Sequence, residues 1–281
     1  MSEAAITPRG VWRRSPLGRR LTIVALTALL ALAAIGPAVV PFDPVATRPP
    51  VALRPPSAAH WFGTDQLGRD VFSRVIASTR VDLGIAATAV LVTLVIGTAL
   101  GAAAGWLGGW TDRVISRLID TIMAFPLFVL AVGVAAALGN SVSSVVIATV
   151  IVNLPLYARQ TRAEVNRRRD AAYVEAARLA GVGSIATVTL HILPNLVPPM
   201  MVQASLNMGW AILNSAGLSF LGLGIRPPNP EWGIMVSEGA AYIISGEWWL
   251  FAFPGLMLLA AILTFAALGD ALRDGLDPRR S

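Results

Sequence analysis

The sequence predicts an all-α integral membrane protein with six transmembrane helices. Apolar residues make up 55% of the 281-residue chain and charged residues only 14%, whereas soluble domains carry about 25% charged residues. The mean hydropathy is +0.67. Several apolar runs are long enough to cross about 30 Å of hydrocarbon, and none shows the two-residue alternation of a membrane β-strand.

The apolar runs divide into six predicted spans, at residues 21–41, 83–107, 118–138, 141–157, 196–223 and 248–268. We therefore expect a cytoplasmic tail over 1–20, a first helix over 21–41 and an extracytoplasmic segment over 42–82. A five-helix core follows over 83–272 with a cytoplasmic loop at 159–195, and a second cytoplasmic tail covers 273–281. No small-residue cleavage site in a polar setting follows the first run, so we expect an uncleaved helix rather than an export signal.

The arginines set the predicted orientation. The chain contains no lysine, and when six spans alternate sides, sixteen of its 22 arginines fall on the side of both termini and six on the other. The positive-inside rule then places both termini in the cytoplasm. A pI near 11.1 can indicate a nucleic-acid binder, but arginines at span ends favour a lipid bilayer as the partner, and we expect no nucleic acid.

Several chemistries lack the residues that they need. A phosphate-binding loop requires a lysine to reach the phosphates, so we expect no Walker-type ATP site. There is no cysteine, and His60 and His191 lie on opposite predicted sides, where they cannot share a metal. We expect a chain without catalytic residues, bound cofactor or metal.

Ionisable residues are expected only outside the spans or at their ends. Asp82 and Asp120 fall at predicted span ends, where water can reach them. Carriers driven by protons or sodium place such groups within the membrane, so the sequence argues against an autonomous secondary carrier.

Glycine and proline mark the expected helix packing. Gly97, Gly101 and Gly105 recur every fourth residue, so one face of the second span allows another helix to approach closely. Five of the six predicted spans contain proline, which removes a hydrogen bond and bends a helix. Such kinks suit either a path that opens and closes or static packing.

A polar motif follows the first span. Residues 42–57 are rich in proline, and residues 60–74 read HWFGTDQLGRDVFSR. The two glycines are expected turn points, and Asp65, Arg69 and Asp70 can pair with one another. The candidate extracytoplasmic motif comprises Gly63, Thr64, Asp65, Gly68, Arg69 and Asp70. A solvated structural turn is its simplest interpretation.

A second polar stretch, YVEAARLAGVGSIATVTLHILPN at residues 173–195, lies between apolar runs. Asp170 is placed to cap a helix over 171–180, and Gly181 to end it in a left-handed turn. We expect Gly183 to break the chain, Ser184 to cap a second short helix and Pro194 to mark the return to the membrane.

The expected helix over 171–180 carries a stripe of small side chains, with Tyr173, Ala176, Ala177 and Ala180 on one face. Glu175 and Arg178 lie three residues apart and can pair. A ten-residue helix is marginal in water, so this one needs a surface to pack on. That surface is either its own bundle or another protein.

EAARLAG and the following VGSIATVTLHILPN resemble the cytoplasmic EAA-type loop of bacterial ABC importer permeases. The pattern maps onto Glu175, Ala176, Ala177, Gly181, Leu193 and Pro194, and His191 stands where the broader pattern has isoleucine. Three further stretches, FGTDQLGRDVFSR, LSFLGLGIRPPNPEWG and LGDALRDGLDPRR, resemble the dipeptide, oligopeptide and nickel permease family, second-subunit type. The resemblance covers about residues 61–280.

The resemblance implies an ABC importer type I permease bundle in the bacterial inner membrane. The loop would form a coupling helix seated in a separate ATPase subunit, which implies roles there for Tyr173, Glu175, Ala176, Ala177, Arg178, Gly181, His191 and Pro194. The implied partners are a homologous second permease, two subunits that bind ATP and Mg, and an extracytoplasmic substrate-binding protein. Transport would proceed by alternating access.

The expected cargo is a di- or oligopeptide, with nickel, glutathione or another small solute as alternatives. A membrane scaffold subunit that binds a partner without transport is the alternative from a different class. Apolar spans with few polar groups do not identify a ligand, so the sequence leaves the cargo and the residues lining its path open.

Overall fold

The computed structural model describes residues 16–275, whose regular secondary structure is helical apart from an isolated β-bridge between Thr64 and Asp70. The long helices are α2 (Pro16–Val39), α3 (Val71–Leu107), α6 (Val142–Arg168), α9 (Leu193–Phe220) and α11 (Trp249–Gly275). The shorter elements are η1 (Pro49–Val51), α4 (Gly109–Met123), α5 (Leu127–Leu138), α7 (Ala172–Leu179), α8 (Ser184–Ala186), the π-helix η2 (Thr187–Ile192) and α10 (Trp232–Ala240).

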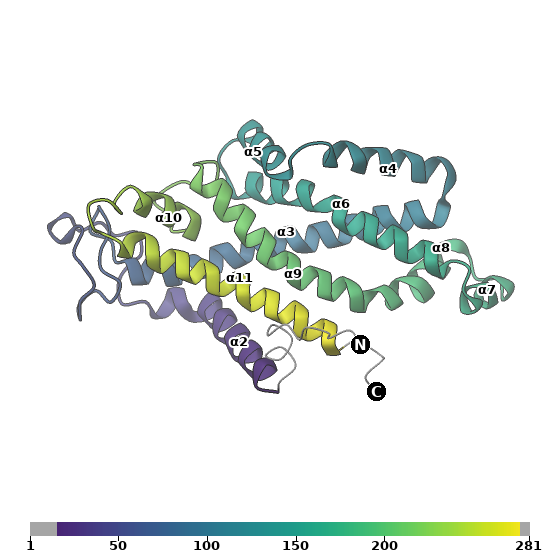
Figure 1. Ribbon diagram of the computed structural model, residues 1–281, viewed down its shortest axis with the longest axis horizontal. Coiled ribbons are helices and arrows are strands. Elements are labelled where there is room, and N and C mark those ends of the chain that lie inside the picture. Colours follow the sequence, from purple (N-terminus) through teal and green to yellow (C-terminus); the bar gives the residue numbers. More distant parts are fainter. Residues whose placement is uncertain (1–15, 276–281) are drawn as a thin grey trace, which may run out of the picture.

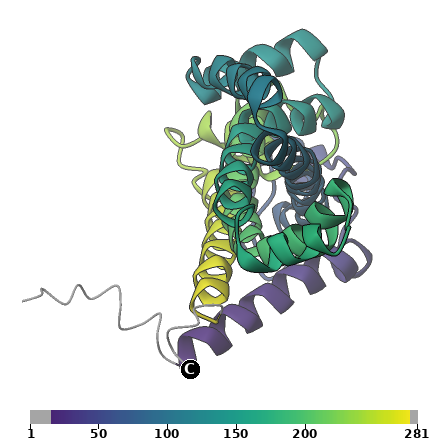
Figure 2. The same cartoon turned by 90° about the vertical axis from the view of Figure 1, so that its right-hand side faces the viewer.

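The helices form an elongated bundle whose two ends differ. The segment 42–70 and α10 lie at one end, and α7 projects at the opposite end (Figure 1). Viewed from the α7 end, α2 runs along one edge of the bundle, and α4 and α5 lie at the opposite edge (Figure 2). The polar loops are thus separated by the length of the long helices.

Five helices are long and apolar enough to cross a membrane, and α4 with α5 makes a sixth candidate if the pair is taken as one span. The predicted third span at 118–138 falls on α4 and α5, which meet at 91°, so the bend expected from its proline is a sharp break between two helices. The break falls at Pro126, which lacks an N–H donor and disfavours helical geometry in the residue before it.

Helix α3 begins twelve residues before the predicted second span. Asp70 caps it, with its carboxylate accepting the backbone N–H of Ser73 at 2.8 Å. Asp82 therefore lies within the helix and is only 2% exposed, so its expected place at a wet span end is wrong. Its Oδ2 accepts the backbone N–H of Trp232, at the start of α10, at 3.2 Å.

The glycine face of α3 packs against α6. A Cβ added at Gly97 would lie 2.6 Å from the Cβ of Tyr157, and one at Gly101 would lie 2.4 Å from the carbonyl oxygen of Ala158. At Gly105 the nearest atom, the carbonyl oxygen of Arg162, would be 2.9 Å away. The absence of side chains on this face is what allows the two backbones to approach so closely.

A second close contact joins α3 to α2. Pro37 lies inside α2 and has no N–H, so the carbonyl of Ala33, four residues earlier, loses its helical donor. Arg80 of α3 supplies the missing donor: its Nε lies 2.8 Å from that oxygen, and its Nη2 donates to the carbonyl of Ala34. The Ala33 carbonyl that Pro37 leaves without a donor is thus hydrogen-bonded by a neighbouring helix.

Candidate functional site

Helix α7 has a defined start and a well-formed end. Its N-cap is Ala171, with φ −74° and ψ 146°, and no side chain caps it. The expected cap, Asp170, instead lies beside Arg169 at 3.4 Å, so that prediction is wrong. At the other end Gly181 has φ +78°. The N–H groups of Gly181 and Val182 donate to the carbonyls of Arg178 and Ala177, both at 3.0 Å, which is a Schellman motif.

The small-residue stripe of α7 is divided between two environments. Val174 and Ala177 are buried, Ala177 at 8% exposure, and Val174 packs with Ile192 and Leu196. Tyr173, Ala176 and Ala180 are exposed, and Leu179 is 84% exposed. The stripe expected to face one surface therefore uses Ala177 against its own bundle and leaves the rest outward.

Arg178 makes a different contact from the expected one. Its guanidinium lies over the ring of Trp106, 4.5 Å from the centroid, near the end of α3. Within residues 16–275 it forms no ion pair with Glu175, which is exposed. A cation–π contact of this kind contributes about 0.5–1 kcal/mol at exposed sites, and it ties α7 to α3.

From residue 184 onward the chain returns to the bundle as an unbroken helical run. Gly183 is the N-cap of α8, so Ser184 lies inside the helix rather than capping it. The helix continues as the π-helix η2, which contains the partly buried His191, and then as α9, where the exposed Pro194 occupies the first turn. Asn195 donates from Nδ2 to the carbonyl of His191 at 2.7 Å. A short turn at residues 180–183 thus joins α7 to the continuous helical run of α8, η2 and α9.

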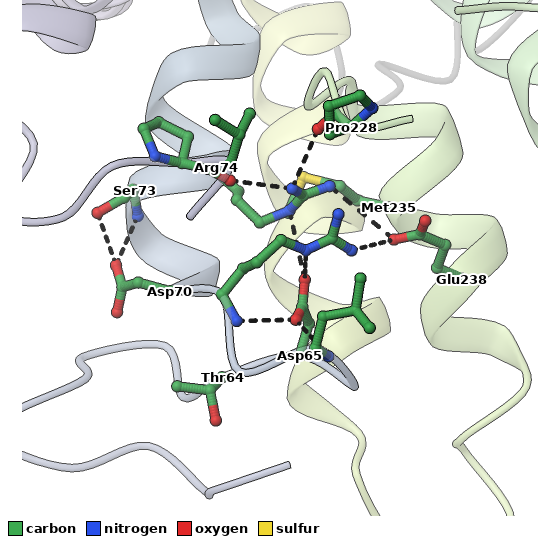
Figure 3. Close-up of polar contacts among 12 residues, drawn as sticks. Thr64, Asp65, Asp70, Ser73, Arg74, Pro228, Met235 and Glu238 are labelled. Carbon is green, nitrogen blue, oxygen red and sulfur yellow. Dashed lines mark hydrogen bonds and ion pairs between the residues drawn. The ribbon is translucent and has the colours of Figure 1, made fainter. Parts of the chain in front are cut away.

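The motif at residues 63–70 forms a buried charge cluster at the other end of the bundle. Arg69 Nε donates to Asp65 Oδ2 at 2.5 Å, and its Nη2 donates to Glu238 of α10 at 3.2 Å. Arg74 lies behind it, with Nε 3.6 Å from Asp65 and Nη2 3.9 Å from Glu238 (Figure 3). Two guanidinium groups therefore face two carboxylates.

The interpretation of this motif as a solvated turn is wrong. Asp65, Arg69, Asp70 and Arg74 are all buried, as is Thr64. Gly63 and Gly68 do form turns, each with positive φ. Asp70 does not pair with Arg69: its Oδ1 lies 2.8 Å from Nδ1 of His60, and its Oδ2 caps α3. The motif joins the segment 42–70 to α10.

Sequence reasoning missed Arg74 and Glu238 as members of this cluster. Arg74 lies one turn beyond Asp70 on α3, so its place in the motif was visible in FGTDQLGRDVFSR. Glu238 lies 169 residues from Arg69, and only its isolated charge in an apolar stretch could have drawn attention to it.

Long apolar helices with organised polar segments at both ends of the bundle (Figure 1) are the architecture of a polytopic membrane protein. The chain belongs to the family of binding-protein-dependent transport system inner membrane components, whose family model matches residues 97–281. It is an inner membrane component of an ABC importer, with a transport rather than a catalytic role.

Characterised relatives include peptide and nickel permeases. The dipeptide transport system permease protein DppC of Alkalihalophilus pseudofirmus is 40% identical over 257 residues, which cover 92% of this chain and 84% of that protein. The di/tripeptide transport system permease protein DppC of Pseudomonas aeruginosa is 40% identical over 92% of this chain and 86% of its own. The nickel transport system permease protein NikC of Escherichia coli is 40% identical over 92% of each chain.

Proposed function

We propose that this chain is one of two homologous permease subunits of an ATP-driven importer of di- or oligopeptides. Two ATPase subunits, which bind ATP and Mg, and an extracytoplasmic substrate-binding protein would complete the complex. The observation that carries the proposal is the outward face of α7, a helix at the end of the bundle whose exposed side chains Tyr173, Ala176 and Leu179 are left uncovered by residues 16–275. Nickel is the alternative cargo, supported by the similarity to NikC.

The same proposal fixes the orientation. If α7 meets an ATPase, its end of the bundle is cytoplasmic, and the charge cluster at the opposite end is extracytoplasmic. Most arginines then lie on the cytoplasmic side, in agreement with the positive-inside rule. Both termini of the chain are on that side in this topology.

We propose that α7 transmits the conformational change of the ATPase subunits to α9. Tyr173, Ala176 and Leu179 present an exposed surface that can seat in a cleft, while Val174 and Ala177 hold the helix to the bundle. Reversing a two-state equilibrium from 1:99 to 99:1 takes about 5.5 kcal/mol. A capped helix that packs against Ile192 and Leu196, and that a short turn at residues 180–183 joins to α8, η2 and α9, transmits force better than a flexible loop.

Cysteine cross-linking tests this role directly, because the chain has no cysteine of its own. Leu179→Cys, on the exposed face, is expected to cross-link to a cysteine in the ATPase cleft, with a yield that changes when ATP is bound. Ala177→Cys is the matched control: it is two residues away but buried, and it is expected to remain unlinked. A complex that assembles and transports but gives no link at Tyr173, Ala176 or Leu179 would contradict the coupling role.

A further inference from the structure

A groove lined by four apolar and four polar or charged residues lies at the ends of α6, α9 and α11 that are nearest α7. It encloses about 480 Å³, within the roughly 300–1,000 Å³ of small-ligand sites. Its lining includes Gln160 of α6, Gln203 of α9, and Arg273 and Asp274 of α11. The surrounding helices are mostly apolar, so a groove with two amides and charges of both signs is distinctive.

The two glutamines are available to a ligand. Both side chains are partly exposed, and neither is hydrogen-bonded to another residue within 16–275. Polar side chains on membrane helices face the bundle interior or a water-filled cavity rather than lipid. The positions of these amides therefore indicate a wetted surface.

Polar groups continue one turn deeper on the same two helices. Tyr157 of α6 and Asn207 of α9 are at most 1% exposed. Within residues 16–275 the hydroxyl of Tyr157 and the amide of Asn207 have no hydrogen-bond partner. Because a buried polar group without a partner is unfavourable, these groups would gain partners if α6 and α9 separated.

We propose that this groove is a peptide-contacting site at the cytoplasmic end of the transport path, where Gln160 and Gln203 hydrogen-bond the peptide backbone. The inference rests on the proposed function and specifies its substrate class. A primary amide both donates and accepts, so it pairs with the N–H and C=O groups of any peptide, whatever its side chains. Arg273 on the same lining carries a positive charge that complements the carboxylate of a peptide.

The same lining is poorly suited to nickel. Imidazole nitrogen is a favoured nickel ligand, and the groove is lined by no histidine and by one carboxylate residue. Within residues 16–275 no group of three or more histidine, cysteine or acidic side chains is placed to hold a metal ion. The groove chemistry therefore favours peptides over a metal cation.

Thiol labelling of the complete complex in inside-out vesicles tests the site. Gln203→Cys is expected to react with a charged maleimide at least tenfold faster than Met201→Cys, and excess dialanine is expected to slow that reaction. Met201 is an exposed residue two positions away on α9, about 200° around the helix. Equal rates at the two positions, or a Gln203→Cys rate that dialanine leaves unchanged, would overturn the inference.

Uptake provides a second readout. Gln160→Leu with Gln203→Leu is expected to lower the uptake of labelled dialanine at least tenfold while the Leu179→Cys cross-link persists, and Gln203→Asn alone is expected to retain most uptake. Normal uptake by the double variant would refute the peptide contact and would leave the proposed function standing. Loss of the cross-link in an otherwise wild-type complex would instead refute the proposed function.

Discussion

The clearest test of α7 as a rigid transmitter is Gly181→Val. Gly181 ends the helix with φ +78°, a conformation that costs an L-residue about 1–2 kcal/mol. A Cβ there would have no atom within 4 Å, so the effect is backbone strain and not a clash. The strain is relieved only by giving up the two bonds of the Schellman motif, from Gly181 and Val182.

A penalty of 1–2 kcal/mol lowers the ratio of the intact to the opened helix end by a factor of roughly 5–30. We expect Gly181→Val to lower peptide uptake by up to that factor, while the assembled complex continues to hydrolyse ATP. The measurement is the number of peptides transported per ATP in reconstituted vesicles. Membrane insertion is expected to be normal, because α7 lies outside the spans.

Gly183→Val is the matched control. Gly183 lies two residues away, its added Cβ would also meet nothing within 4 Å, and its φ of −64° suits any residue. Its coupling ratio is expected to equal that of the wild type. If Gly181→Val transports as many peptides per ATP as Gly183→Val, the reasoning that a stiff helix end is required is refuted.

Two further predictions concern stability. Gly101→Ala places a Cβ 2.4 Å from the carbonyl oxygen of Ala158 and is expected to destabilise the bundle by about 1–3 kcal/mol. Gly84→Ala on the same helix meets nothing within 4 Å and is expected to be nearly neutral. Equal thermal unfolding midpoints of the two variants in detergent would contradict close α3–α6 packing. Asp65→Asn removes a carboxylate that faces two buried arginines and is expected to lower the free energy of unfolding by about 3–5 kcal/mol. Asp43→Asn, at an exposed site in the same segment, is expected to leave the unfolding midpoint unchanged.

The helical class and the glycine contact were predictable because each depends on local periodicity. A run of apolar residues is sufficient to indicate a span, and Gly97, Gly101 and Gly105 share a face in any helix. Proline in this span predicted a bend, but the 91° angle between α4 and α5 could not be predicted. Hydropathy averages over about 19 residues and does not register a change in backbone direction.

The candidate sites were predictable only where they are local. Asp65 and Arg69 lie four residues apart and pair, whereas Glu238 reaches Arg69 across 169 residues. On α7, small residues occur on several faces, so the sequence did not determine which face turns inward. Packing of Val174 against Ile192 and Leu196 decides that question, and it is a property of the assembled bundle.

The contact between Arg80 and the α2 kink also bears on how the chain enters the membrane. When α2 first leaves the aqueous channel of the insertion machinery, the carbonyl of Ala33 has no donor, because Pro37 cannot supply one. An unsatisfied carbonyl in hydrocarbon costs several kcal/mol. Arg80 arrives only with α3. We therefore expect α2 to wait beside that channel and to move into lipid together with α3, as a helical hairpin.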